Sequence, residues 1–360
     1  MKNYSKRIIA MVLSMVIFFG ALETAARILG FHLKKAQWSS DRYVSHEHMG
    51  HIFKPDFQGW MYKKIATGFK KVPVNINSWG LRDDEFPLEK PEGEFRILCL
   101  GDSFTFGYLL PIEKSYPFKL EQCFAIKMPD IRVQVINAGI PAYEINRELA
   151  LLKELGIKFS PDLVILQFQI MDPYGAIEYA HWKRTGVLGE EDNAGQKLWL
   201  PKLDLSATTE LLRFLSYEVI RLLDLKKTPK GALHAKVYTP RDNKAWELYK
   251  QVLTKMVEFT REQKIPIILL VLPDKIQLYS GSNKPQRILK QYCAEQGIPV
   301  IDILPELKKV RNHRIDIVQD RHFNGLAYNI IAQELFKYIT SQYLKEGPTS
   351  PRGKALKLGY

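Results

Sequence analysis

Cysteine is scarce in this chain of 360 residues, which has only three (Cys99, Cys123 and Cys293) and no C-x-x-C pair. That scarcity excludes a disulfide scaffold and the common thiolate zinc sites. Glycine (22) and proline (20) occur at ordinary frequency, which excludes collagen-like and low-complexity classes. Charge of one sign does not dominate, since 52 Lys and Arg face 39 Asp and Glu. The basic residues are scattered, so nucleic-acid binding is not expected.

What the sequence does contain begins with an apolar N-terminal segment. Lys2, Lys6 and Arg7 precede a run from Ile8 to Leu29. These 22 residues, as a helix, would rise about 33 Å and span the roughly 30 Å hydrocarbon core of a bilayer. The basic residues before the run predict that the N-terminus stays in the cytoplasm and that the rest of the chain faces the extracytoplasmic side.

We therefore expect residues 1–30 to be a signal anchor in a single-pass protein of the cell (inner) membrane. Glu23 and Arg27 are four residues apart, so on a helix they pair on one face near the outer interface. A cleaved signal peptide is the alternative, with Thr24 and Ala26 as the small residues before the cut. The domain would then be secreted or periplasmic, so both alternatives place it beyond the membrane.

From residue 95 onward, short apolar runs alternate with helical patterns. Such near-continuous runs are typical of strands buried on both faces of a parallel sheet. The predicted strands are 96–100, 133–136, 163–167, 267–272 and 300–303. The predicted helices begin at Ser115 and cover 144–155, 242–263, 284–296 and 324–344. This alternation predicts a three-layer α/β/α domain with a parallel, doubly wound, flavodoxin-like sheet.

Three other segments break this rhythm. Residues 31–92 show no sustained period and are expected to form a stalk and a wrapping arm. Residues 176–239 are too long for a simple connection, so we expect an inserted lid over one edge of the sheet. Residues 345–360 are expected to be a disordered tail, which leaves 93–344 as the main domain.

A histidine cluster lies within the expected stalk. His46, His48 and His51 form an H-x-H-x-x-H pattern, which raises the question of a metal site. Beyond Glu47, no carboxylate or cysteine completes a convincing ligand set. We therefore expect a solvated loop there and no bound metal.

The residues that suggest chemistry stand at two distant places. The first strand of the domain ends in Gly101-Asp102-Ser103, which places a hydroxyl at the carboxyl edge of the sheet, where open α/β folds bind ligands. A serine is unreactive there unless a base accepts its proton. Asp320-Arg-His322, near the far end of the chain, opens a helix. The aspartate can hold the imidazole while the other ring nitrogen faces the serine.

Together these motifs resemble the SGNH (GDSL-type) hydrolase superfamily. The Gly-Asp-Ser motif is followed about 220 residues later by Asp320-Arg-His322-Phe-Asn324. Asn77-Ser-Trp-Gly80-Leu-Arg82-Asp83 resembles the lead-in to the first block in a membrane-anchored bacterial branch. The resemblance extends from about Asn75 to Tyr343, and it implies a hydrolase that acts on ester bonds.

The resemblance also assigns roles to individual residues. Ser103 would be the nucleophile, His322 the general base and Asp320 the residue that orients the base. The backbone N–H groups of Ser103 and Gly139 would be oxyanion donors. Asp102 would support the nucleophile turn without direct chemistry.

Two positions depart from the family pattern. Where the third block usually has an Asn as side-chain oxyanion donor, this chain has Met171, and Gln169 is the alternative donor. Losing one such donor typically costs about 10²–10³ in kcat. The common Asp-x-x-His spacing is also absent, because position 319 is Gln and the acid is Asp320, as in a branch that resembles alginate-type acetyltransferases. Asp316 is the alternative acid.

These features predict a serine esterase or O-acyltransferase that acts on O-acyl groups of extracytoplasmic carbohydrate through an acyl-serine. No metal or cofactor is expected, and the expected partners are the ester substrate and, through the N-terminal helix, the membrane. Met171 favours an alternative, a catalytically weakened polysaccharide-binding protein on the same fold. A lipid-acting esterase, with its basic surface near anionic headgroups, is a further alternative.

Overall fold

The computed structural model describes Ser14, Phe18 and residues 42–65, 68–185, 240–274, 277–278, 283–317 and 322–344. The chain divides into two compact units, residues 1–39 with 191–235 and residues 40–190 with 236–360. All of the described ranges lie in the second unit. No helix among the described residues is long and apolar enough to cross a membrane. The predicted anchor (apart from Ser14 and Phe18), most of the predicted lid and the predicted tail lie outside those residues.

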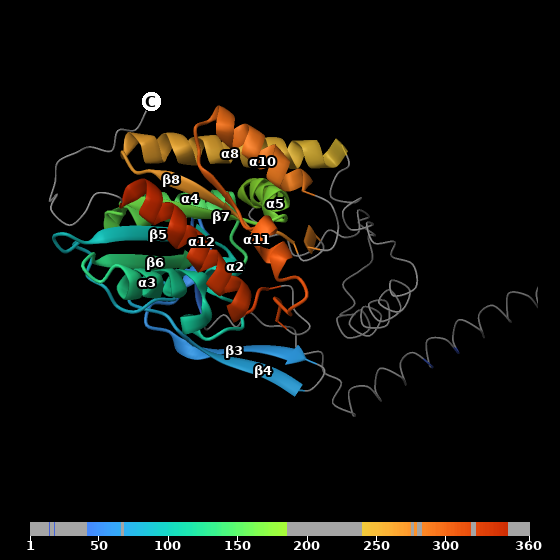
Figure 1. Ribbon diagram of the computed structural model, residues 1–360. Helices are drawn as coiled ribbons and strands as arrows, with labels where there is room; N and C mark the ends of the chain where they lie inside the picture. Colours follow the sequence, from blue (N-terminus) through green and yellow to red (C-terminus); the bar gives the residue numbers. More distant parts are fainter. Residues whose placement is uncertain are drawn as a thin grey trace, which may run out of the picture. The chain divides into compact units, whose positions relative to one another are not determined.

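A five-stranded parallel sheet forms the centre of the second unit (Figure 1). Its strands are β5 (Phe95–Gly101), β6 (Val133–Gly139), β7 (Leu163–Phe168), β8 (Ile267–Val271) and β9 (Val300–Asp302). Their spatial order is β6-β5-β7-β8-β9, which is the flavodoxin-like order and confirms the predicted fold class. β7 and β8 are buried at every position, as strands covered on both faces must be.

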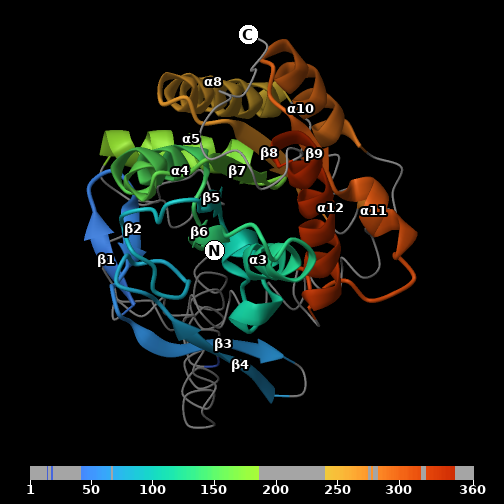
Figure 2. The same cartoon turned by 60° about the vertical axis from the view of Figure 1, so that its left-hand side comes forward.

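Helices cover both faces of this sheet. Their bounds are α2 (Ser103–Phe106), α3 (Tyr116–Lys127), α4 (Ile145–Glu154), α5 (Asp172–Thr185), α8 (Pro240–Glu262), α10 (Lys284–Glu295), α11 (Leu304–Lys309) and α12 (Gly325–Tyr343), with 3-10 turns η1 (Ile112–Lys114) and η2 (Gly156–Phe159). α3 packs on α12 and β6, whereas α4, α5 and α8 pack on one another (Figure 2). The two sets form the outer layers of the predicted α/β/α arrangement.

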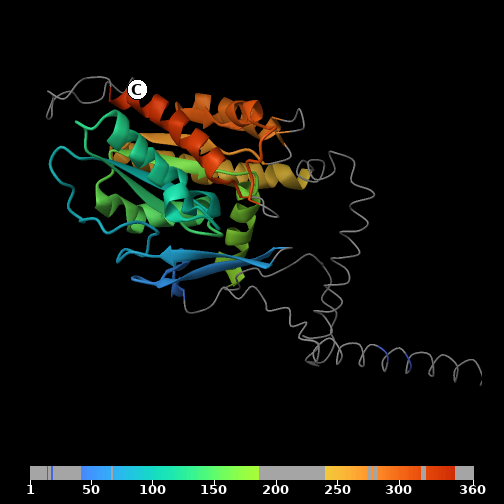
Figure 3. The same ribbon diagram turned by 60° about the horizontal axis from the view of Figure 1, so that its bottom comes forward.

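Two antiparallel hairpins (blue in Figure 3) occupy the segment for which the sequence shows no sustained period. One pairs β1 (Tyr43–His46) with β2 (Gly50–Phe53), and the other pairs β3 (Gln58–Ile65) with β4 (Gly68–Asn75). Phe53 stacks on Phe106 of α2 with ring centroids 5.2 Å apart, and the Met61 sulfur accepts a hydrogen bond from the Leu109 N–H. Phe53 and Met61 thus pack the two hairpins against the segment that follows β5, whereas the sequence pattern showed no strands here.

The Arg82 guanidinium holds the C-terminal end of α2. It is 1% exposed and donates hydrogen bonds to the carbonyl oxygens of Phe106, Gly107 and Leu110 at 3.0, 2.9 and 2.7 Å. Carbonyl groups at a helix end have no partner within the helix, so a buried end needs donors from elsewhere. Arg82 belongs to the Asn77–Asp83 segment, which the sequence analysis singled out. It joins this segment to the helix that begins at Ser103.

Candidate active site

Strand β5 places Ser103 at the carboxyl edge of the sheet. The Asp102 carboxylate accepts a hydrogen bond from the Phe104 N–H at 2.8 Å and so caps α2, whose first residue is Ser103. Gly107 ends this one-turn helix with a φ of +74°, in the left-handed region that favours glycine. The helices that follow β5 and β7 cover opposite faces of the sheet, so the order of the strands reverses between β5 and β7. Ser103 lies at the end of β5, next to this switch point, where open α/β sheets bind ligands.

Ser103 and His322 meet although they are 219 residues apart, and the His322 Nε2 atom lies 2.7 Å from Ser103 Oγ. The main chain holds the histidine. Its carbonyl accepts a hydrogen bond from the Ile317 N–H at 2.9 Å, and the next residue, Phe323, forms an antiparallel bridge with Asp316. A serine hydroxyl within hydrogen-bond distance of an imidazole nitrogen is the arrangement that general-base activation requires.

Two aromatic rings border the imidazole. The ring centroids of Phe104 and Tyr108 lie 4.7 and 4.8 Å from that of His322. Both residues come from the segment directly after the nucleophile, so this segment fixes the serine and also the surroundings of its base. An apolar border lowers the local dielectric and strengthens the hydrogen bond between serine and histidine.

The predicted orienting residue, Asp320, lies outside the described residues, and its role stays a prediction. The alternative acid, Asp316, is 9% exposed. Its bridge to Phe323 joins it to the residue that follows the base. Both acids therefore belong to the short segment that leads into His322.

The predicted backbone donors for an oxyanion differ in their present partners. The Ser103 N–H has no hydrogen-bond partner in the described part of the chain, as is usual for the first residue of a helix. The Gly139 N–H donates to the side-chain oxygen of Asn137 at 3.1 Å, so it must leave that acceptor before it can bind a substrate oxygen. Packing also requires the glycine, because a Cβ at 139 would lie 2.3 Å from the Phe106 nitrogen.

The loop after β7 carries the two positions considered for a side-chain donor. The Met171 side chain is 48% exposed. Gln169 is partly buried, and its N–H donates to the Asp172 carboxylate at 2.9 Å. Asp172 therefore fixes the backbone of this loop, while position 171 presents its side chain to solvent.

Gln167 is a positioning residue that the sequence analysis missed. Its side-chain oxygen accepts hydrogen bonds from the Asp102 N–H at 3.2 Å and from the Thr105 hydroxyl at 3.1 Å, so β7 holds the residues on both sides of Ser103. Gly101 leaves room for this contact, since a Cβ there would lie 2.6 Å from that oxygen. The available signal was a polar residue within the otherwise apolar run 163–168.

Buried carboxyl groups lie behind the nucleophile turn. Burial raises the pKa of Asp102 to about 6, although the Phe104 N–H and the His322 charge lower it. Glu148 of α4 is 1% exposed; burial raises its pKa well above the ordinary value, and the carboxyls of Asp172 and Asp102 raise it further. Burial and Asp102 likewise raise the pKa of Asp172. These groups keep protons at a pH where exposed carboxyls have lost theirs.

Glu148→Gln should stabilise the native state at high pH. The buried carboxyl stays protonated above its ordinary pKa of 4.5 while the unfolded one ionises. The native state then binds more protons, so wild-type stability falls as pH rises above that value. The amide cannot ionise. In urea titrations, we expect the free energy of unfolding to exceed that of wild type by about 1–3 kcal/mol at pH 8 and to match it near pH 4.5.

The matched control for this prediction is Glu258→Gln, at an exposed position of α8. This substitution removes a carboxylate that is already solvated, so the free energy of unfolding of the variant should match that of wild type at both pH values. A gain of the same size in this control would contradict the prediction. So would a Glu148→Gln protein that is no more stable than wild type at pH 8.

Two of the three N-terminal histidines share one carboxylate, and the third contacts a backbone carbonyl oxygen. Ring nitrogens of His46 and His48 lie 3.4 and 2.6 Å from the Glu154 carboxylate, and His51 Nε2 lies 3.2 Å from the Pro141 carbonyl oxygen. Burial lowers the pKa of His51 to about 4. Within the ranges that the structure describes, no group of His, Cys, Asp and Glu residues is arranged to hold a metal ion.

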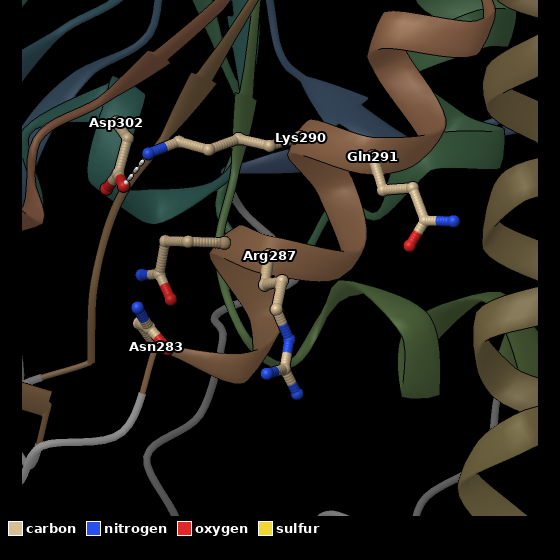
Figure 4. A pocket seen from close by; sticks show the side chains of 6 residues that line it. Asn283, Arg287, Lys290, Gln291 and Asp302 are labelled. Carbon is tan, nitrogen blue, oxygen red and sulfur yellow. Dashed lines mark hydrogen bonds and ion pairs between the residues drawn. The ribbon is translucent and has the colours of Figure 1, made fainter.

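A pocket of about 460 Å³ lies away from these residues, on α10 and β9 (Figure 4). Lys290 of α10 pairs there with Asp302 at the end of β9, at 2.7 Å. Arg287 and Gln291 also line it. Neither Ser103 nor His322 does, so this pocket is not part of the candidate active site.

Sequence comparison gives one partial likeness to a curated protein. No protein-family model matches the chain. Over 77 residues the chain is 38% identical to an arylesterase from Vibrio mimicus. The match covers 21% of this chain and 38% of the arylesterase, so it spans well under half of that protein's length.

Solved structures show distant likenesses. They include a G-D-S-L family protein from Desulfitobacterium hafniense (17% identity, 67% of this chain and 98% of that one, TM-score 0.36). An acetylxylan esterase from Geobacillus stearothermophilus has 18% identity, 70% and 96% coverage and a TM-score of 0.41. A lipase/acylhydrolase from Enterococcus faecalis has 14% identity, 69% and 96% coverage and a TM-score of 0.41. The fold class itself follows from the order and direction of the strands.

Proposed function

We propose that the protein is a serine esterase that cleaves ester bonds through an acyl-serine intermediate. One observation carries the proposal: Ser103 Oγ and His322 Nε2 lie 2.7 Å apart at the carboxyl edge of the sheet. The partial likeness to an arylesterase supports ester chemistry. Asp320 remains the proposed orienter of the imidazole, with Asp316 as the alternative.

In the proposed reaction, His322 accepts the hydroxyl proton as Ser103 attacks the ester carbonyl. The resulting oxyanion binds the unpartnered N–H of Ser103, together with the Gly139 N–H once that group leaves Asn137. Collapse breaks the bond to the alcohol, which takes the proton from His322. Water, or a sugar hydroxyl in an O-acyltransferase, then loses a proton to His322 and attacks the acyl-serine. The bond between the acyl carbon and Ser103 Oγ breaks, His322 returns the proton to Oγ, and the acid or the new ester leaves.

We place the proposed reaction on O-acyl groups of carbohydrate outside the cytoplasm. The apolar run from Ile8 to Leu29 and the basic residues before it support a membrane anchor with this orientation. The mature protein should therefore keep its N-terminus and stay with membranes after a carbonate wash. N-terminal sequencing of each fraction tests this expectation. A mature chain that begins near Arg27 in the soluble fraction would show a cleaved signal peptide instead.

Ser103→Ala should abolish labelling by a fluorophosphonate probe and lower hydrolysis of a short-chain aryl ester by more than about 10³-fold, because the nucleophile is lost. Ser341→Ala, in the last turn of α12, is the matched control and should label like wild type. Gel fluorescence and the rate of aryl ester release are the two measurements. If the Ser103→Ala protein labels as strongly as the control, the nucleophile assignment is wrong.

A catalytically weakened polysaccharide-binding protein is the second candidate function. Met171 favours it, because a thioether at that position cannot donate a hydrogen bond to an oxyanion. The two candidates differ in what a restored donor would do. An enzyme that lacks one donor gains rate when the donor is added, whereas a binding protein gains none.

Met171→Asn should therefore raise kcat by up to about 10²-fold with little change in KM, if catalysis now uses backbone donors alone. Met171→Leu, which adds no donor, is the control. If Gln169 already fills the role, Met171→Asn should be neutral and Gln169→Ala should lower kcat. If none of these variants changes turnover of an aryl ester while an immobilised polysaccharide is still bound, the esterase proposal fails and the binding protein stands.

A further inference from the structure

A second pocket, of about 520 Å³, opens beside the segment that carries His322. Its walls come from β4, from the segment that includes η1 and α3, from residues 314–317 and from the start of α12. Four lining residues are cations, namely Lys70, Lys114, Lys119 and Arg314. Asp316 is the one carboxyl group among the lining residues, and it is 9% exposed. The lining of this pocket is therefore strongly positive.

Three of these cations lack an acidic partner among the residues that the structure describes. Lys114, Lys119 and Arg314 form no ion pair within the part of the chain that the structure describes, whereas Lys90 and Lys290 each pair with an aspartate, at 2.6 and 2.7 Å. Like charges around a concave surface repel one another and focus a positive field in the hollow. A bound anion would relieve that repulsion.

The pocket is close to the reacting atoms along two stretches of chain. Asn324, on its wall, is two residues after His322, and Leu110, also on its wall, is two residues after Tyr108. The Tyr108 ring lies 4.8 Å from the imidazole. Two residues of chain span at most about 7 Å. The pocket therefore adjoins the surroundings of the imidazole, and the proposal assigns to it a substituent that neighbours the acyl group of a bound sugar.

We infer that this pocket binds an anionic group, a carboxylate or a phosphate, that the substrate carries next to its acylated position. Hydrogen bonds from cationic side chains to such anions are among the strongest in proteins. The stem of Lys114 packs against Gly325, where a Cβ would lie 3.3 Å from the lysine Cδ, so α12 helps to fix this cation. Assigning the anion to an ester substrate rests on the proposed function, whereas the preference of the pocket for anions does not.

Three sugars of matched shape test the preference for anions. Methyl glucoside, methyl glucuronoside and methyl glucoside 6-phosphate carry a hydroxyl, a carboxylate and a phosphate at the same end of the ring. Titration calorimetry of the full-length protein at low salt should show at least about tenfold tighter binding of a charged sugar than of the neutral one. The tighter of the two charged sugars identifies the anion. The preference should shrink in about 0.5 M NaCl, because salt screens the lysines.

A double variant of the pocket and a control variant elsewhere test whether this pocket causes the preference for charged sugars. The double variant K114Q/K119Q should lower the ratio of charged to neutral affinity by about tenfold. Lys158→Gln is the control, because Lys158 is exposed on η2, which precedes β7 and so lies at the opposite edge of the sheet. Equal affinity of the wild type for all three sugars would overturn the inference. Equal effects of the double variant and the control would overturn it too.

Turnover of the 4-O-acetyl derivatives, in which the ester and the charged group are on neighbouring ring carbons, separates this inference from the proposed function. A higher kcat/KM for the charged acetyl sugars, arising in KM and reduced in K114Q/K119Q, supports both. Hydrolysis of all three at the same kcat/KM, without selective binding, overturns the anion inference and leaves the esterase standing. Anion-selective binding with no acetyl release and no fluorophosphonate labelling of Ser103 supports the pocket and overturns the esterase.

Discussion

Two glycines at the ends of neighbouring strands set the position of the nucleophile. Gly101 and Gly139 pair in register across β5 and β6, and a Cβ on either would come within 2.1 or 2.3 Å of an atom of α2. Since no side chain fits there, the helix lies directly on the sheet, and Ser103, its first residue, cannot shift relative to the strands. Thr105 extends the contact to Gln167 on the next strand. The geometry of the proposed acyl transfer thus depends on close packing of a four-residue helix against strand ends.

Burial on both faces explains why the sheet could be predicted from the sequence, since it leaves apolar runs that match the five observed strands. The strand β6 was predicted to end at Ile136, because Asn137 interrupts the apolar run. In the structure, the strand continues to Gly139. The hairpins between Tyr43 and Asn75 were missed for a different reason. β1 and β2 have only four residues each, and lysines on β3 and β4 obscure the alternation of apolar residues.

The candidate site was predictable where a motif fixes local structure and unpredictable where distant strand ends meet. Ser103 follows a buried strand and His322 comes shortly before the last helix, so both could be placed at one edge of the sheet. Gln167 and Glu148 matter because folding buries them beside the nucleophile turn. The sequence marks Gln167 as a polar residue in an apolar run, but it does not show which residues either side chain will meet. Likewise, the sequence shows Asn137 two residues before Gly139, but not that its amide oxygen accepts the hydrogen bond of the Gly139 N–H, the proposed oxyanion donor.

In the proposed mechanism, the separation of 219 residues between Ser103 and His322 also determines when the chain becomes reactive during its synthesis. At roughly 5–20 residues per second, about 10–40 s pass between the addition of Ser103 and that of His322. Throughout that interval the serine has no base, however early its strand, turn and helix form. Reactivity is thus among the last properties that the growing chain acquires, and a ribosome that stalls before His322 leaves behind a serine that is chemically ordinary.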